Sequence, residues 1–144
     1  MSERAPAETA SSYKWFCDIT TRWMDNDVYG HVNNVAYYSY FDTAANLYLI
    51  RDGGLDIQRS NVIGVVVESK CSYRAPIAYP DAVRAGLRVD KLGHRSVTYG
   101  IGIFSSKNEI AAASGHFVHV FVDRVTRVPV PMPEEIRKAL EAIA

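Results

Sequence analysis

The chain has 144 residues, a length that suits one domain, and 48% of them are hydrophobic, enough for a packed core. Sixteen Lys and Arg residues balance sixteen Asp and Glu residues, which argues against a general nucleic-acid partner because such proteins carry excess positive charge. Cys17 and Cys71 are too few for a disulfide framework and favour a reducing compartment. No hydrophobic run approaches the ~20 residues of a membrane helix, and the N-terminus does not resemble a signal peptide. We therefore expect a cytoplasmic protein without a membrane partner.

The N-terminal part of the chain predicts a tail, a strand and a loop. Residues 1–13 are small and polar, so we expect a disordered tail and a single domain over 14–144. Hydrophobic and polar side chains alternate over residues 15–23, which predicts a first strand. The polar segment 24–33 then predicts a loop with Gly30 as its turn residue.

Residues 34–52 predict a long helix, because hydrophobic residues recur there at helical spacing. They also occur beyond one stripe, so the helix should be largely buried. Asn33 or Asn34 suits the N-cap, and Gly53 and Gly54 suit the C-terminal end.

Four further runs predict strands over residues 65–74, 83–90, 96–103 and 110–122. In the first run, alternation places one set of side chains on a common face: Val65, Val67, Cys71 and Tyr73. A short C-terminal helix should follow, with Pro133 in its first turn and Ile136, Leu140 and Ile143 as its hydrophobic edge.

This order of elements predicts an α+β domain in which one helix covers one face of an antiparallel sheet. A monomer of this kind would leave an exposed edge strand, which proteins avoid. Edge-to-edge pairing of two copies would remove that edge, so we expect a homo-oligomer, either a dimer or a tetramer of two dimers.

The segment from Asp25 to Tyr37 carries the chemistry, because it places a carboxylate, an imidazole and two carboxamides in a loop that enters a buried helix. A helix N-terminus offers free N–H groups that can polarise a carbonyl and stabilise an oxyanion. A carboxylate beside it can attack that carbonyl or deprotonate water. These are the parts of an acyl hydrolase, although Asp, Asn and Gly are also common at helix starts simply as caps and turns.

The run Asp-x-x-Gly-His-Val-Asn-Asn-x-x-Tyr over residues 27–37 resembles the signature of the hotdog-fold thioesterases, a group that includes 4-hydroxybenzoyl-CoA thioesterase. The resemblance covers about residues 14–123 and implies the hotdog fold, a five-stranded antiparallel sheet wrapped around a long central helix, to which the sequence pattern adds the short C-terminal helix. Plant acyl-carrier-protein thioesterases carry a similar run in which Asn stands at the position of Tyr29. In the 4-hydroxybenzoyl-CoA enzymes Pro follows the aspartate and no His follows the glycine, so Val28 and His31 place this chain outside that substrate group.

The resemblance implies a role for most residues of this segment. Asp27 would act as nucleophile or general base, and backbone N–H groups near Asn33 and Asn34 would bind the thioester carbonyl. His31 would orient water or Asp27, or simply hold the loop. Tyr29, Gly30 and Tyr37 are the expected substrate contacts here, and Asp25 is expected to be a solvated or Arg-paired loop residue.

Basic residues outside this segment suit the phosphates of coenzyme A. Lys91, Arg95 and Ser96 belong to a predicted hairpin turn that resembles the family's Gly-x-Ser turn beside the coenzyme A groove. Arg74 or Arg88 would add a further phosphate contact, since Arg pairs well with phosphate oxygens. Ordinary solvated charges are the alternative for each of these residues.

Several other polar residues require an interpretation. Asp42, on the helix, is the alternative catalytic carboxylate, because some members of the family that the chain resembles use a carboxylate on the central helix; otherwise it would be a polar contact at a dimer seam or channel wall. Glu68 is expected to pair with a Lys or Arg. His116 and His119 lie three apart in a strand and so face opposite ways, which makes them poor joint metal ligands. We expect no metal and no cofactor.

The predicted function is hydrolysis of an acyl-CoA or acyl-carrier-protein thioester to the free acid and the thiol. Two alternatives remain open: a hotdog dehydratase acting on similar thioesters, and a non-catalytic protein that binds acyl thioesters. The presence of Asp27 beside a helix N-terminus disfavours the binding protein.

Overall fold

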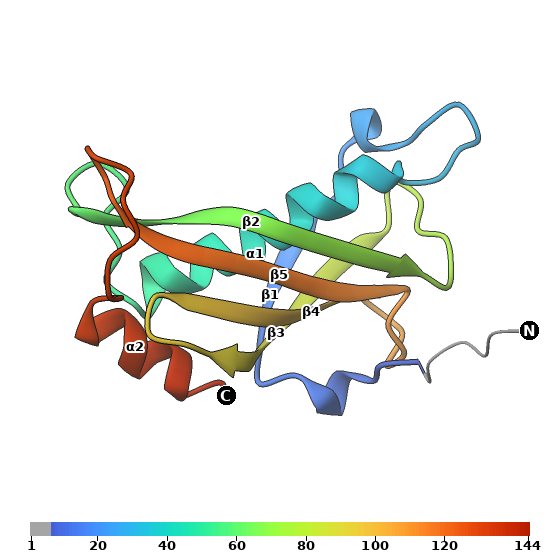
Figure 1. Ribbon diagram of the computed structural model, residues 1–144. Helices are drawn as coiled ribbons and strands as arrows, with labels where there is room; N and C mark the ends of the chain where they lie inside the picture. The colour runs from blue at the N-terminus through green and yellow to red at the C-terminus, as the bar shows by residue number, and fades with distance from the viewer. Residues whose placement is uncertain (1–6) are drawn as a thin grey trace, which may run out of the picture.

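The structure, a computed structural model, describes residues 7–144. Its elements follow the predicted order along the chain (Figure 1). The strands and helices are β1 (Trp15–Thr20), α1 (Asn34–Arg51), β2 (Val62–Tyr73), β3 (Ala82–Leu92), β4 (Ser96–Ser105), β5 (Ala113–Asp123) and α2 (Glu134–Glu141). Two short 3-10 turns, η1 (Ala10–Ser12) and η2 (Trp23–Asp25), flank β1.

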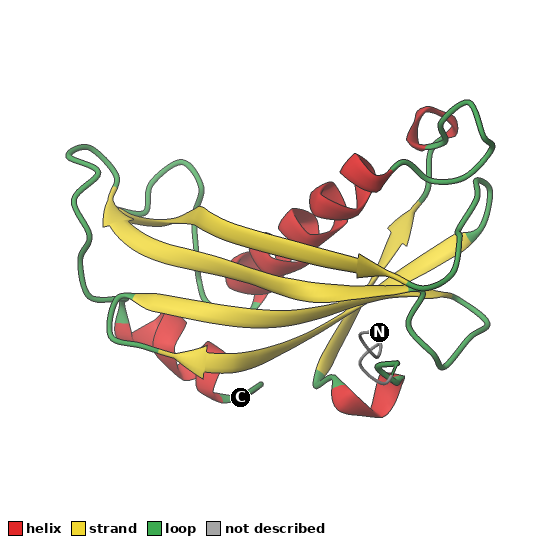
Figure 2. Ribbon diagram, turned by 45° about the vertical axis from the view of Figure 1, so that its right-hand side comes forward, coloured by secondary structure: helices red, strands yellow, loops and turns green. Residues whose placement is uncertain are grey.

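The five strands form one antiparallel sheet in the order β1-β3-β4-β5-β2. The sheet curves around α1, which lies along its concave face, and α2 sits at one end of the sheet (Figure 2). The predicted fold class, a five-stranded antiparallel sheet wrapped around a long helix with a short C-terminal helix, is confirmed. Strands β1 and β2 are the two edges of the sheet.

The core lies between α1 and the inner face of the sheet. Phe41 and Leu49 of α1 are fully buried, as are Tyr99 of β4 and Phe121 of β5. Burial of each such side chain contributes about 1.5–3 kcal/mol. These contacts fix α1 on the sheet, and the Tyr73 hydroxyl of β2 donates to the carbonyl of Asn34 at 3.2 Å. The start of α1 is therefore held beside the end of β2.

Both predicted ends of α1 are confirmed. Asn33 is the N-cap, and its side-chain oxygen accepts a hydrogen bond from the Val35 N–H at 2.9 Å. At the other end the N–H groups of Gly53 and Leu55 both donate to the Leu49 carbonyl at 3.0 Å, and Gly54 has φ +70°. Glycine adopts a positive φ without the steric cost that a Cβ brings, so Gly54 turns the chain away from the helix axis.

The alternation expected along β2 is wrong, because the strand contains a β-bulge between Val66 and Glu68. Val65 pairs with Val120 on the outer face, whereas Tyr73 pairs with the buried Ala113 on the inner face. An extra residue in one strand reverses the side-chain alternation beyond it. The bulge therefore places Val65 and Tyr73 on opposite faces, not on the predicted common face.

The first strand is shorter than predicted, because β1 ends at Thr20 rather than at residue 23. The Thr21 hydroxyl donates to the carbonyl of Asp81 at 2.8 Å, and the chain then turns into η2. Trp23, the last residue of the predicted strand, is 76% exposed.

The prediction of a disordered tail over residues 1–13 does not hold for residues 8–13, and residues 1–6 lie outside the described residues. Thr9 forms a β-bridge with Ile110, and Tyr13 is buried against the outer face of the sheet. Glycines 86 and 102 make room for the Tyr13 ring, because a Cβ at either position would come within 2.8 Å of it. Burial of this aromatic ring outweighs the polar composition of its neighbours.

The C-terminal helix is confirmed with a small change at its start. Pro133 is the N-cap of α2 rather than part of its first turn. Ile136, Leu140 and Ile143 are buried, as predicted.

Candidate active site

The segment between β1 and α1 forms a tight turn that presents Asp27. The Asp27 N–H donates to the His31 carbonyl at 2.9 Å, and the Gly30 N–H donates to the Asp27 carbonyl at 3.0 Å. Gly30 has φ +83°, which confirms it as the turn residue. One carboxylate oxygen of Asp27 accepts the Tyr29 N–H at 2.8 Å, so the other oxygen is the one left for a substrate or water.

This turn is attached to the segment that follows β2. The Asn26 side chain accepts the Tyr79 N–H at 3.0 Å, and the Val32 N–H donates to the Ile77 carbonyl at 2.7 Å. Both attachments join the Asp27 turn to a neighbouring loop through the main chain of that loop. The turn is thus fixed on both of its sides even though its tip, Val28, is 94% exposed.

The N-terminus of α1 offers one free amide close to Asp27. The Asn33 N–H already donates to the Asp25 carbonyl at 2.7 Å, and the Val35 N–H is capped by the Asn33 side chain. The Ala36 N–H donates to the Asn33 carbonyl at 2.9 Å. Within the described part of the chain the Asn34 N–H has no acceptor. Of the two positions suggested for carbonyl binding, the structure therefore leaves Asn34 available and makes Asn33 the helix cap.

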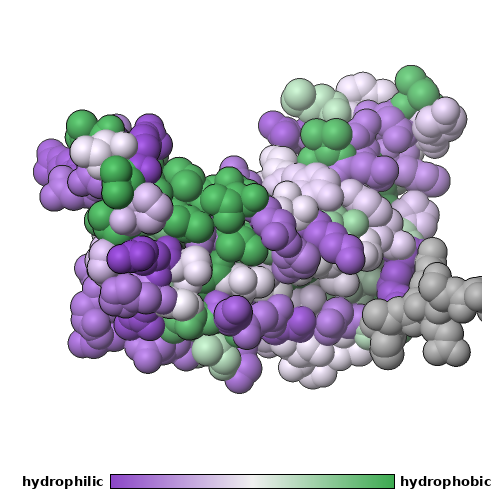
Figure 3. Space-filling view, viewed as in Figure 1, coloured by the Kyte–Doolittle hydropathy of each residue, from purple (hydrophilic) through white to green (hydrophobic). Residues whose placement is uncertain are grey.

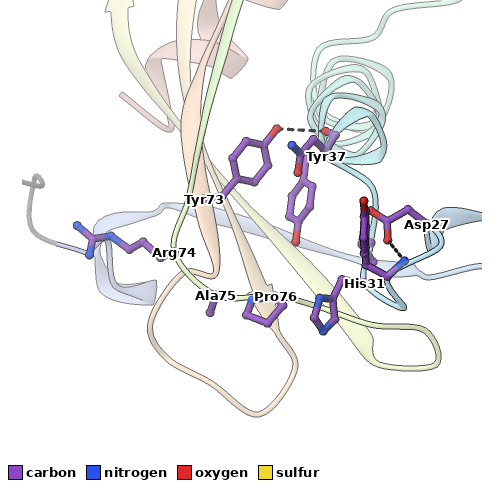
Figure 4. Close-up of a pocket in the computed structure, with 10 residues that line it drawn as sticks. Asp27, His31, Tyr37, Tyr73, Arg74, Ala75 and Pro76 are labelled. Carbon is purple, nitrogen blue, oxygen red and sulfur yellow. Dashed lines mark hydrogen bonds between the residues drawn. The ribbon is translucent and has the colours of Figure 1, made fainter.

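A depression of about 430 Å³ brings these groups together (Figure 4). Five of the predicted site residues line it: Asp27, Tyr29, His31, Asn34 and Tyr37. Tyr73 and Pro76, which come from the end of β2 and the segment after it, also line the depression and are not among the predicted site residues. Only the pairing of β2 with β5 and the position of α1 bring them here, so no local pattern could have identified them. Arg74, a suggested phosphate contact, also lines the depression.

A second depression, about 770 Å³ in volume, lies on the other side of the Asp27 turn. Trp23, Met24, Val28 and Gly30 line it together with Asp27. Asp27 is therefore accessible from two sides, one with aromatic and polar walls and one with mainly apolar walls.

The side chains of His31 and Asp27 do not form a hydrogen bond or an ion pair with each other in the described structure, although their main chains are hydrogen-bonded. Figure 4 shows the imidazole and the carboxylate pointing in different directions from the turn. His31 is exposed at the wall of the first depression. Its suggested contact with Asp27 is thus absent, whereas a contact with substrate or water remains open to it.

The aromatic side chain of Tyr37 gives the depression a neutral phenol. Burial raises the pKa of Tyr37 to about 12. The phenol therefore stays protonated at neutral pH and can donate a hydrogen bond.

The predicted phosphate contacts Lys91, Arg95 and Ser96 lie at the opposite end of the sheet from Asp27. On β5, Val120 pairs with Ser96, and Ala113 pairs with Tyr73 beside the site. Val120 and Ala113 are seven residues apart along that strand. At 3.3 Å per residue the two ends are about 23 Å apart. The structure therefore does not bring these three residues to Asp27 within one chain.

Arg88 is not free to bind phosphate. Its guanidinium donates to Asp90 at 2.7 Å and to Glu8 at 3.3 Å, and it lies 4.7 Å from the Tyr13 ring centroid. Arg88 instead fastens the N-terminal segment to the sheet.

The remaining polar residues also have clear positions. His116 and His119 face opposite ways, as predicted: His119 is buried against Tyr99, and His116 pairs with Glu68 at 2.7 Å on the outer face. The prediction that Glu68 pairs with a Lys or Arg is therefore wrong. Asp42 accepts a hydrogen bond from Asn46 on the exposed side of α1.

The described residues contain no cluster of three or more His, Cys, Asp or Glu side chains placed to hold a metal ion. Nor does any described helix combine the length and apolar character needed to cross a membrane.

The sheet wrapped around one helix, with an aspartate turn at the start of that helix, defines a hotdog-fold protein with the features of an acyl hydrolase. Residues 21–140 match the family model of the thioesterase-like superfamily. The chain therefore belongs to that superfamily.

The chain is also similar to solved structures and to a curated protein. The chain is 53% identical to the PA5185 protein of Pseudomonas aeruginosa PAO1, with a TM-score of 0.94 and coverage of 96% of each chain. It shares the fold of the gentisyl-coenzyme A thioesterase BH1999 at 22% identity and a TM-score of 0.77, covering 88% of this chain and 99% of that one. The Bacillus subtilis protein YsmA is 23% identical over 91 residues, which are 63% of this chain and 61% of YsmA.

Proposed function

We propose that the protein hydrolyses an acyl-CoA or acyl-carrier-protein thioester to the free acid and the thiol. The observation that carries the proposal is the shared position of the Asp27 carboxylate and the free Asn34 N–H at one depression. Membership of the thioesterase-like superfamily supports it, as does the shared fold with a gentisyl-coenzyme A thioesterase.

In the proposed reaction the thioester carbonyl oxygen accepts a hydrogen bond from the Asn34 N–H. The positive end of the α1 dipole adds to the stabilisation of the oxyanion, because negative charge is favoured at a helix N-terminus. Removal of one such donor commonly lowers turnover by about 100-fold or more.

The second proposed component is the Asp27 oxygen that Tyr29 does not engage. It deprotonates a water that adds to the carbonyl, or it attacks the carbonyl itself to form an anhydride that water then hydrolyses. Either route breaks the C–S bond, releases the thiol and leaves the acid. His31 and Tyr37 would contact the substrate or the attacking water from the wall of the depression.

Phosphate recognition requires a second copy of the chain if Lys91, Arg95 and Ser96 take part. The free edge of β2 suits such pairing, because Val66 and Val67 are 45% and 59% exposed there. Antiparallel pairing of two β2 strands would place the hairpin end of the partner's sheet beside the Asp27 end. The partner's β4 would then lie three strand spacings from β2, about 14 Å, within reach of a long substrate such as coenzyme A.

A second hydrophobic surface supports association beyond a dimer. Hydrophobic side chains gather on the outer face over the part of β2 and β5 near α2 (Figure 3). The strand pairing places Ile63, Val65, Val118 and Val120 on this face. Large hydrophobic patches often mark contacts between proteins, which is consistent with a tetramer of two dimers.

The test is steady-state release of free thiol from a panel of saturated acyl-CoAs by three Asp→Asn variants. Asp27→Asn should lose about two or more decades of turnover, the scale expected for a general base. Asp56→Asn is the matched control, because its carboxylate also accepts a main-chain N–H two residues on, at 2.9 Å, but away from the site. Asp42→Asn tests the alternative carboxylate on α1.

The panel separates the competing functions. Release of thiol from saturated substrates distinguishes a thioesterase from a dehydratase and from a binding protein, neither of which hydrolyses the thioester. Near-native turnover of Asp27→Asn would show that Asp27 is only a turn residue. A loss of turnover in Asp42→Asn alone would assign the catalytic role to Asp42 on α1.

A further inference from the structure

Asp25 is a buried carboxylate that the proposed reaction does not use. Only 5% of this residue is exposed, and no other Asp or Glu among the described residues is buried. Its carboxylate accepts the Tyr40 hydroxyl at 2.8 Å and the Arg22 N–H at 3.0 Å, with the Arg22 guanidinium at 3.3 Å. A buried carboxylate is costly unless it is paired in this way, so the site is specifically built around it.

The main chain of Asp25 makes a second connection to α1. Its carbonyl accepts the Asn33 N–H at 2.7 Å, directly at the helix cap. Tyr40 lies further along the same helix, is 3% exposed, and packs edge-on against Tyr37 at 5.9 Å between ring centroids. Asp25 thus binds α1 at two points, at the helix cap through its main chain and at Tyr40 through its side chain.

These two contacts of Asp25 lie next to both proposed reactive groups. Asp27 follows Asp25 by two residues, and the free Asn34 amide follows Asn33 by one. The other attachments of the turn, through Asn26 and Val32, lead to the loop after β2 and not to α1. Among the described contacts, Asp25 therefore provides the direct hydrogen-bonded link between the Asp27 turn and the helix that carries the amide.

We propose that Asp25 and Tyr40 form a positioning pair that holds the Asp27 carboxylate at a fixed distance from the Asn34 N–H. The proposal rests on the proposed function, because it concerns the same two reactive groups. Tyr40 is suited to this role, since burial and the Asp25 carboxylate raise the pKa of its phenol and keep it a neutral donor. Loss of the pair would let the turn move relative to the helix cap, and small displacements of reacting groups slow catalysis strongly.

The test compares Tyr40→Phe with Tyr48→Phe. Both tyrosines lie on α1, both are 3% exposed, and both donate a hydrogen bond, Tyr40 to Asp25 and Tyr48 to the Ala139 carbonyl near the opposite end of the helix. Each substitution deletes one buried hydroxyl. A merely structural role would therefore give both variants similar losses in stability and similar turnover.

We expect Tyr40→Phe to lower kcat for an acyl-CoA by about tenfold or more while KM changes little, because the depression itself stays intact. Tyr48→Phe should keep a native kcat at a comparable loss of stability. Asp25→Asn combined with Tyr40→Phe should be no slower than the slower single variant, since the two residues act as one unit. Tyr40→Phe decides the question even if Asp25→Asn fails to fold.

The outcomes separate this inference from the proposed function. Equal kcat in folded Tyr40→Phe and Tyr48→Phe, with Asp27→Asn inactive, would overturn the positioning pair alone. A fully active Asp27→Asn would overturn both. A fall in kcat that occurs in Tyr40→Phe and not in Tyr48→Phe would establish the pair.

Discussion

His119 should make the folded protein sensitive to acid. Its side chain is 1% exposed and its ring lies 5.2 Å from that of Phe117 and 5.3 Å from that of Tyr99, centroid to centroid. The Tyr99 hydroxyl is 3.2 Å from the imidazole Nδ1, and the Nε2 has no partner among the described residues. Burial lowers the pKa of His119 from 6.5 to about 4, so the folded protein holds a neutral imidazole at neutral pH.

The magnitude follows from these two pKa values. Above pH 6.5 His119 is neutral in both the folded and the unfolded chain and adds no pH dependence. As the pH falls below 6.5 the unfolded chain binds a proton that the folded chain cannot accept until about pH 4. The free energy of unfolding should therefore drop by about 2 kcal/mol between pH 7 and pH 5 from this residue alone, and by about 3 kcal/mol at pH 4.

Urea unfolding at fixed protein concentration, followed from pH 7 to pH 4, measures this effect. His119→Gln should be less stable at pH 7 but should lose about 2 kcal/mol less than the parent on going to pH 5. His116→Gln is the control, because His116 is partly exposed and paired with Glu68. Parallel loss of stability in the parent and in His119→Gln would refute the assignment of a buried neutral imidazole.

Two further substitutions test the packing of the fold. Leu49→Ala should lower the free energy of unfolding, measured in urea, by about 2–5 kcal/mol because Leu49 is fully buried in α1. Ile50→Ala, at a residue 42% exposed, should lower it by less than half as much, and equal losses would contradict the described core. Arg88→Ala should release the segment held through Glu8 and Tyr13, with faster amide hydrogen exchange over residues 8–13 and a loss of about 1–3 kcal/mol; unchanged exchange there would show that Arg88 does not fasten the segment.

Much of the fold and of the candidate site is encoded in local patterns. The helix cap at Asn33, the turn at Gly30 and the position of Asp27 before a buried helix all depend on residues close together in sequence. Local patterns predict them because a cap and a turn are completed by neighbours within three or four residues.

The incorrect or missing predictions concern contacts between distant segments. Asp25 is paired with Arg22 at 3.3 Å, which confirms one of its two expected states, but its burial was not predicted, because it depends on hydrogen bonds with Tyr40 and Asn33 of α1. The partner of Glu68 is His116, 48 residues away on the neighbouring strand. The β-bulge in β2 reverses its side-chain alternation, and no hydrophobic pattern within one strand reveals an extra residue.

The separation of Arg95 from Asp27 leads to a test of whether Arg95 acts at the active site of its own chain or at that of the partner subunit. Within one chain the two residues lie at opposite ends of the sheet, so a contact of Arg95 with the same acyl-CoA requires the partner subunit. Mixed dimers of an Asp27→Asn chain and an Arg95→Ala chain then contain one site with both substitutions and one site with neither. Such mixtures should regain native KM for acyl-CoA at about half the native turnover per dimer, since each site draws on both subunits.

Action of Arg95 within its own chain gives the opposite result. Every active site in the mixed dimer would then carry Arg95→Ala, and KM for acyl-CoA would stay as high as in the Arg95→Ala homodimer. A short acyl thioester without the nucleotide serves as the control substrate, because Arg95 would contact only phosphate and KM for this substrate should be native in every combination. An equal effect of Arg95→Ala on both substrates would remove Arg95 from coenzyme A recognition, and a fully active 16.0 kDa monomer in light scattering would contradict the shared site as a whole.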